Sequence, residues 1–326
     1  MQPLKRLIGA LLGIVTLGMA VEPAAAQSNY PARTVRVIVP FPPGGGTDIF
    51  ARLAVQTLAE NLGAQFYVDN IAGAGGNIGT GQAAKAAPDG YTVLFAFGSF
   101  VVNPSFFAKV PYDPVKDFAP VTLSVATTTV LTVNPSVPAR TVNELVELIR
   151  ANPGKYSYST GGVGTQQHLA GEQLRLARSL DIVHVPYGGA GPSNAAVVAG
   201  HTPIGLTSLA SVLPQIKAGT LRAVAVTSKA RSQILPEVPT MAEAGYPDIV
   251  GDSWVGVLVP AGTPAPIITL LHRAMVDFIA LPDIKKRLAT LGYETIASTP
   301  EEFVQRIRLE LGTWRSVIQA ANIKPQ

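Results

Sequence analysis

The sequence contains no cysteine among its 326 residues. Without thiols the chain has no disulfide, no thiol nucleophile and no zinc-thiolate or iron–sulfur site. Charged residues are also scarce, at 14% of the chain, and the net charge is only +4. The longest basic run, Lys285-Lys286-Arg287, falls on a predicted surface helix. Because a nucleic-acid surface needs clustered basic side chains, this distribution argues against a nucleic-acid partner.

Long apolar runs are missing except at the N-terminus, where the pattern is that of a secretory signal peptide. Lys5 and Arg6 precede an apolar stretch at 7–19, and Ala24-Ala25-Ala26 gives an A-x-A cleavage signal before Gln27. The stretch is shorter than the roughly 20 residues of a membrane-spanning helix. We therefore predict cleavage after Ala26 and a mature chain in the periplasm. An uncleaved membrane anchor is the alternative.

The mature chain is long enough for two domains, and 47% of the whole sequence is hydrophobic. Segments with strand and helix patterns alternate, which is typical of βαβ units and predicts a mainly parallel sheet flanked by helices in each domain. The predicted strands are 35–39, 65–68, 91–95, 156–159, 182–185, 203–206 and 221–227. The predicted helices are 48–61, 77–87, 141–151, 165–178, 192–199, 210–218, 265–280, 283–291 and 299–320.

Two extended β-branched segments, 125–133 and 252–260, interrupt the helix-rich pattern. We expect the chain to cross between the domains at these segments. The predicted organisation is a signal peptide at 1–26, a first lobe made of 27–127 plus 253–326, and a second lobe made of 128–252.

A glycine-rich loop at 40–48 lies between a predicted strand and a predicted helix, with Gly44, Gly45 and Gly46 in succession. Free N–H groups and the positive end of the helix dipole at such a loop favour a carboxylate or a phosphate. The loop lacks the Lys-Ser or Lys-Thr of a P-loop and the G-x-G-x-x-G spacing of dinucleotide folds. It is either an anion-binding loop or a tight turn in which Asp48 caps the helix.

Three more glycine-rich loops, at 73–77, 159–165 and 187–192, also join a predicted strand to a predicted helix. Ligands of open α/β sheets bind beyond the carboxyl ends of the strands. Loops from the two domains are therefore expected to face each other across a cleft, although a single loop of this kind is often only a turn.

Signatures of catalysis and of metal binding are weak. His168 and Glu172 are four residues apart on one helical face, but no H-E-x-x-H motif is present. The segment around Ser193 narrowly fails the G-x-S-x-G pattern. We predict no enzyme activity, no metal and no cofactor. A secreted α/β hydrolase that uses Ser193 or Ser253 remains the alternative.

A set of motifs covers nearly the whole mature chain in a familiar order. They are 39–48 (VPFPPGGGTD), 69–70 (DN), 73–79 (GAGGNIG), 111–118 (PYDPVKDF), 159–170 (STGGVGTQQHLA), 185–187 (VPY), 235–245 (LPEVPTMAEAG) and 254–264 (WVGVLVPAGTP). Together they resemble the Bug family, the periplasmic substrate-binding receptors of tripartite tricarboxylate transporters. The resemblance implies a two-lobed, type II periplasmic binding protein fold of the Venus-flytrap kind. Such a protein, expected to be a monomer, closes on a small organic carboxylate and delivers it to membrane permease subunits.

The resemblance also implies which residues contact the ligand. In the first lobe they are Phe41, Gly45, Gly46, Thr47 and Asp48, with Ser99 and Asn103 nearby. In the second lobe they are Ser159, Gly161, Thr165 and His168, with Tyr187 and Thr207 or Ser208 on the wall.

Two departures from the family pattern affect specificity. After Asp69-Asn70 this chain has Ile71-Ala72, where the family often has a basic residue and a proline. The segment 205–208 is neutral, where many members carry an acidic residue. Aliphatic di- or tricarboxylates, aromatic acids and amino acids all stay open as ligands, and so does a signalling role in place of transport.

Overall fold

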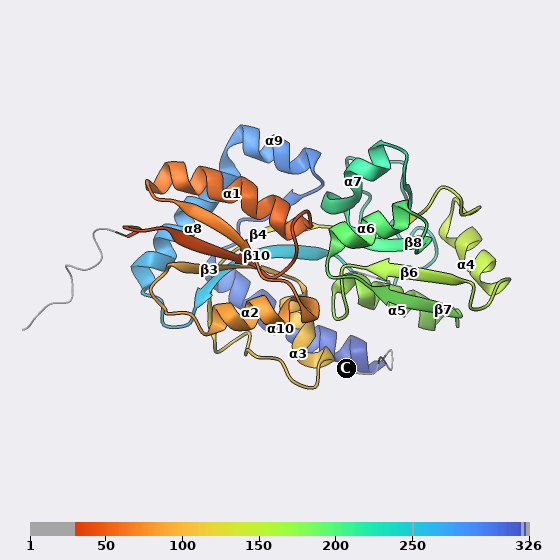
Figure 1. Ribbon diagram of the computed structural model, residues 1–326, viewed down its shortest axis with the longest axis horizontal. Helices are drawn as coiled ribbons and strands as arrows, with labels where there is room; N and C mark the ends of the chain where they lie inside the picture. The colour runs from red at the N-terminus through yellow and green to blue at the C-terminus, as the bar shows by residue number, and fades with distance from the viewer. Residues whose placement is uncertain (1–29, 250, 321–322, 324–326) are drawn as a thin grey trace, which may run out of the picture.

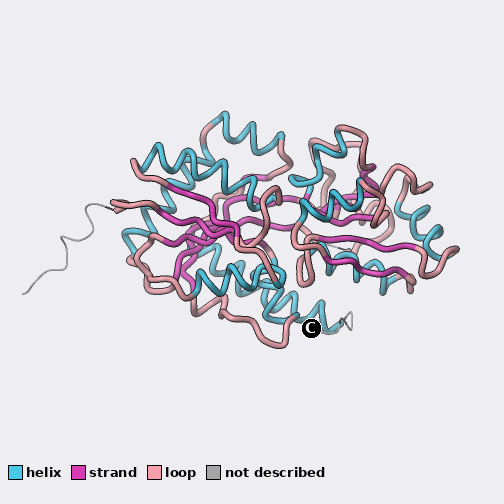
Figure 2. Tube along the Cα trace, viewed as in Figure 1, coloured by secondary structure: helices cyan, strands magenta, loops and turns pink. Residues whose placement is uncertain are grey.

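The computed structural model describes residues 30–249, 251–320 and 323, so the predicted signal peptide lies outside the described residues. Two lobes lie side by side, each built on one β-sheet with helices on both faces (Figures 1 and 2). The first sheet has the strand order β11-β4-β10-β3-β1-β2, and the second has the order β7-β6-β8-β5-β9. The predicted two-lobed α/β fold is therefore confirmed.

The strands of the first sheet are β1 (Val35–Val39), β2 (Phe66–Asn70), β3 (Thr92–Phe97), β4 (Phe118–Thr127), β10 (Ser253–Pro260) and β11 (Glu294–Thr295). Those of the second are β5 (Thr129–Val133), β6 (Tyr156–Thr160), β7 (Ile182–Pro186), β8 (Ile204–Ser208) and β9 (Arg222–Val226). The chain passes from one sheet to the other between β4 and β5 and returns before β10. Ser253 on β10 pairs with Thr127 on β4, so the two crossings run next to each other.

The helices of the first lobe are α1 (Gly46–Leu62), α2 (Asn77–Ala84), α3 (Ser99–Phe106), α8 (Ala265–Ala280), α9 (Pro282–Thr290) and α10 (Pro300–Ala320). Those of the second lobe are α4 (Val142–Arg150), α5 (Gln166–Ala177), α6 (Ala190–Val198) and α7 (Leu209–Lys217). Of these helices, α3 is absent from the sequence prediction. It contains Pro104, which hides its helical pattern.

The sheets are mixed, which corrects the prediction that they are mainly parallel. β1 pairs in parallel with β2 and β3, but β10 runs antiparallel to both β3 and β4. In the second sheet β5 runs antiparallel to β8 and β9. The physical reason is the double crossing: β5 enters the second lobe and β10 enters the first, and each runs away from the lobe junction while its neighbours run toward it.

This topology brings the loops that follow five of the strands to the junction between the lobes. β1 and β3 in the first lobe, and β6, β7 and β8 in the second, end at the junction and lead into α1, α3, α5, α6 and α7 (Figure 1). Five helix N-termini from two lobes therefore lie around one space.

Candidate ligand-binding site between the lobes

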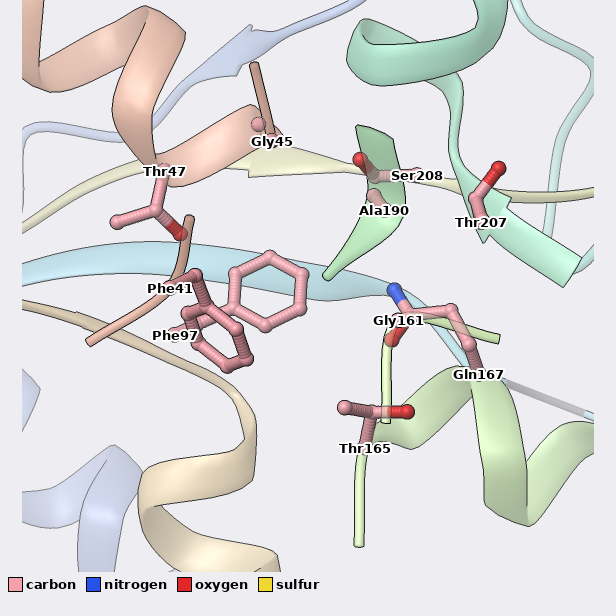
Figure 3. A pocket seen from close by; sticks show the side chains of 11 residues that line it. Phe41, Gly45, Thr47, Phe97, Gly161, Thr165, Gln167, Ala190, Thr207 and Ser208 are labelled. Carbon is pink, nitrogen blue, oxygen red and sulfur yellow. The ribbon is translucent and has the colours of Figure 1, made fainter. Parts of the chain in front are cut away.

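A cavity lies at the lobe junction, where these loops meet (Figure 3). It has about 370 Å³ of space not occupied by protein atoms, part of which is open to solvent. Its lining residues are Phe41, Gly45, Gly46, Thr47 and Phe97 from the first lobe and Gly161, Thr165, Gln167, Ala190, Thr207 and Ser208 from the second. Both lobes therefore contribute to one small site.

Helix N-termini from both lobes line this cavity. α1 and α6 begin at Gly46 and Ala190, and neither helix has a side-chain cap. The first N–H groups of an α-helix have no partner within the helix, and the helix dipole places about half a positive charge at that end. The cavity lining includes no lysine, arginine or histidine. The arrangement is suited to binding a carboxylate through backbone N–H groups.

The two walls of the cavity differ in chemistry. Phe41 and Phe97 of the first lobe pack edge to face, with ring centroids 5.7 Å apart, and give an apolar wall. The second lobe contributes the polar residues Thr165, Gln167, Thr207 and Ser208 (Figure 3). The hydroxyl groups of Thr165 and Thr207 donate to Gly162 O and Asn194 Oδ1. The body of a ligand can therefore lie against aromatic rings while polar groups contact the other side.

A second cavity adjoins the first and shares Phe41 and Gly161 with it. It contains about 590 Å³ of space not occupied by protein atoms, and Tyr187 lies in its wall. The rest of the lining is Gly73, Ala74, Gly75, Gly76, Phe107, Gly162, Val163, Pro186 and Gly188. Tyr187 therefore belongs to this outer space and not to the inner cavity.

Asp48 does not line either cavity, and its carboxylate is occupied by protein groups. It accepts hydrogen bonds from Gly44 N–H at 2.9 Å, from Asn70 Nδ2 at 2.9 Å and from Arg52 Nε at 3.0 Å. Burial acts to raise the pKa of Asp48, but these hydrogen bonds outweigh it and the pKa is lowered. Asp48 therefore fixes the glycine loop that precedes α1 as a charged group.

His168 also lies outside the cavity lining and is buried. Its ring stacks on that of His184 at 4.2 Å, and its Nδ1 accepts the N–H of Gly164 at 3.4 Å. Burial lowers the pKa of His168 to about 4, so the imidazole is neutral at pH 7. His168 thus stabilises the loop between β6 and α5 through its hydrogen bond with Gly164, without lining the cavity.

The candidate metal pair of His168 and Glu172 is held by other contacts. Glu172 accepts hydrogen bonds from Tyr158 Oη at 2.6 Å and from Arg175 Nη2 at 2.7 Å. Within residues 30–249, 251–320 and 323, no group of three or more His, Asp or Glu side chains is arranged to hold a metal ion.

Three other predicted residues are buried near the cavity without lining it. Ser99 is the first residue of α3, and Ser159 Oγ near the end of β6 accepts from Ser193 Oγ at 2.9 Å. Asn103 donates to Gly75 O at 3.0 Å, and Gly164 of the second lobe approaches its side chain closely. Asn103 is thus a contact between the lobes.

The lobes are closed over the cavity. A Cβ at Gly46 of the first lobe would lie 3.1 Å from Ser208 Oγ of the second. A Cβ at Gly189 of the second lobe would lie 2.7 Å from Cδ of Pro42 in the first. At these positions a glycine leaves room for a side chain of the other lobe.

Of the fourteen residues predicted for ligand contact, the structure brings eight to the inner cavity and Tyr187 to the outer one. Phe97, Gln167 and Ala190 line the inner cavity and were missed. Phe97 ends an apolar strand and resembles a core residue in the sequence. Gln167 carried a usable signal, since it lies two residues after the helix cap Thr165, directly after the glycine-rich loop 159–165.

The fold and the cavity together define a class of protein: a two-lobed receptor that encloses a small solute between its lobes. Comparison with known proteins gives the family. The model of the tripartite tricarboxylate transporter family receptor matches residues 50–323, so the chain belongs to this family. The resemblance to the Bug family is confirmed by its relatives.

Protein BugT of Bordetella pertussis is 35% identical over 317 residues, which cover 97% of each chain. A solved structure described as a periplasmic transporter is 43% identical, with a TM-score of 0.88, and covers 91% of this chain and 100% of its own. A protein of R. palustris, solved with adipate, is 32% identical with a TM-score of 0.88 over the same shares.

Proposed function

We propose that this receptor captures a small organic carboxylate between its lobes and delivers it to the membrane subunits of a tripartite transporter. The observation that carries the proposal is the meeting of uncapped helix N-termini from both lobes at a cavity whose lining has no cationic side chain. Such an environment favours one negative charge through oriented N–H groups. The adipate bound by the R. palustris relative supports a carboxylate as the ligand.

The place of action we propose is the periplasm, with the mature chain starting at Gln27 after removal of the signal peptide. The described helices include none with the length and apolar character required to span a bilayer. We also propose that the receptor acts as a monomer, because the binding cavity is complete within one chain.

The hydrolase alternative finds no support in the surroundings of its two serines. Ser193 Oγ donates to Ser159 Oγ at 2.9 Å, and Ser253 Oγ donates to Gln166 Oε1 at 2.7 Å. A serine nucleophile needs a general base within hydrogen-bond reach. In the described part of the chain, neither serine donates to such a base. A signalling partner in place of the permease uses the same cavity and remains a second proposal.

Thermal unfolding of the refolded mature protein against paired acids and their neutral carboxamides tests the proposed function. A ligand at 100 times its Kd stabilises by about 2.7 kcal/mol. For a chain of this size each kcal/mol raises Tm by roughly 2 °C. We expect a rise of about 5 °C with one class of acids and none with the matching carboxamides. Equal shifts with the amides, or none with any acid, would contradict the proposal.

A further inference from the structure

Among the described residues that line the inner cavity, Gln167 is the one whose side chain carries an amide group. It is the second residue of α5 and is 4% exposed. Its amide reaches into the cavity from the second lobe, across from the Phe41 and Phe97 wall (Figure 3). The amide therefore belongs to the wall of the cavity that lies in the other lobe from the start of α1.

The orientation of this amide is fixed by Ser253. Ser253 Oγ donates its single proton to Gln166 Oε1 at 2.7 Å. Toward Gln167 it can then only accept a hydrogen bond, and Gln167 Nε2 donates to it at 3.0 Å. The side chain of Gln167 lines the cavity, and no described protein group donates to its Oε1 (Figure 3). The cavity therefore has an acceptor oxygen in the second lobe, across from the N–H groups at the start of α1 in the first.

The charges around the cavity limit what can meet that oxygen. No cationic side chain lines the cavity, and the carboxylate of Asp48 is turned to Arg52 and Asn70. A second carboxylate next to Gln167 would lose its hydration, would have no cationic side chain beside it and would meet the acceptor oxygen of Gln167. An ammonium group would lack a negative partner in the lining. A neutral donor such as a hydroxyl group can donate a hydrogen bond to the amide oxygen without the burial of a further charge.

We propose that Gln167 determines specificity, and that the ligand is a monocarboxylate with a neutral hydrogen-bond donor, such as a hydroxyl group, at the end opposite the carboxylate. The carboxylate lies at the N-terminus of α1, the apolar body lies against Phe41 and Phe97, and the donor binds Gln167 Oε1. The inference rests on the proposed function and narrows it to one class of acid.

Two matched series of acids test the inference by isothermal titration calorimetry of the refolded mature protein. The first is hexanoate, 6-hydroxyhexanoate and adipate; the second is benzoate, 4-hydroxybenzoate and terephthalate. In the series that binds better, we expect the hydroxy acid to bind about 10-fold more tightly than the unsubstituted acid. The dicarboxylate is expected to bind most weakly.

The variant Gln167→Met removes the amide and keeps an unbranched side chain of similar length. It is expected to reduce the preference for the hydroxy acid to about 2-fold or less while the affinity for the unsubstituted acid changes less than about 3-fold. Gln82→Met, the same change at an exposed position on α2, is the control and is expected to keep the full preference.

If Gln167→Met does not fold, Gln167→Glu preserves the shape of the side chain. Its negative charge is expected to weaken all six acids by about 10-fold or more. The inference is overturned, with the proposed function intact, if the dicarboxylates bind as tightly as the hydroxy acids or if Gln167→Met keeps the wild-type preference. If none of the six acids binds the wild type, the inference is overturned, and the proposed function fails with it only when the wider thermal panel of acids gives no shift either.

Discussion

Gly189→Val is expected to weaken ligand binding by about 10- to 100-fold, because overpacking of this kind costs about 1–3 kcal/mol. Gly189 has a φ of 167°, an extended conformation open to any residue, so valine brings no backbone strain within the second lobe. A Cβ there would lie 2.7 Å from Cδ and 2.9 Å from Cγ of Pro42, which belongs to the first lobe. The substitution therefore opposes lobe closure and leaves each lobe intact.

The neighbouring glycine supplies the control for this effect. A Cβ at Gly188 would meet no atom within 4 Å, so Gly188→Val is expected to bind ligand like the wild type. Calorimetry gives the affinities, and small-angle X-ray scattering shows whether added ligand still compacts the protein. Equal affinity of Gly189→Val and wild type, or an equal loss in both variants, would contradict closure as the basis of binding.

Asp48→Ala is expected to lower both stability and ligand affinity. The substitution leaves the Gly44 N–H without its acceptor, removes one of the two acceptors of the Asn70 amide and frees the loop before α1. Because the partner Arg52 is 53% exposed, the ion pair itself contributes little to stability. The lost hydrogen bonds account for most of the expected decrease in the free energy of unfolding, which is about 2 kcal/mol. Urea unfolding measures this loss, and calorimetry measures the affinity.

The pH dependence of this effect has a definite sign. The pKa of Asp48 is lowered by its hydrogen bonds, so the charged form is favoured by folding. Its contribution is full above the ordinary pKa of 3.8 and is lost as the pH falls through the lowered value. The stability difference between wild type and Asp48→Asn is therefore expected to be constant from pH 5 to 8 and to shrink below about pH 4. A difference that grows in acid would contradict this role.

Local signals in the sequence predicted much of the fold because the physics behind them is local. Thr141 and Thr299 each begin a capping box, and in the structure each accepts the N–H of the glutamate three residues later, at 3.1 Å. The glycine-rich loops are predicted between a strand and a helix from local signals too, because glycine runs interrupt the patterns of both elements. The segments 125–133 and 252–260 interrupt the helix-rich pattern, which predicts the crossings. The local sequence of β10 carries no signal for its antiparallel direction, because that direction is set by pairing with the distant strands β3 and β4.

The candidate site was harder to predict where it depends on contacts between distant segments. Whether Asp48 faces a ligand or the protein depends on Asn70, which lies 22 residues away. The position of Gln167 depends on Ser253, from the second crossing, and that of Phe97 on the ring of Phe41. None of these pairings has a periodic signal in the sequence, so they emerge only when the two lobes are assembled.

The central claim is that helix N-termini from both lobes hold a carboxylate in the inner cavity. A crystal structure of the refolded mature protein with the acid that gives the largest thermal shift tests it most directly. The account predicts a carboxylate oxygen within about 3.2 Å of the Gly46 or Thr47 N–H, with further contacts from Gly161 or Ala190. A ligand bound outside this cavity, or one whose carboxylate faces away from the start of α1, would contradict the claim.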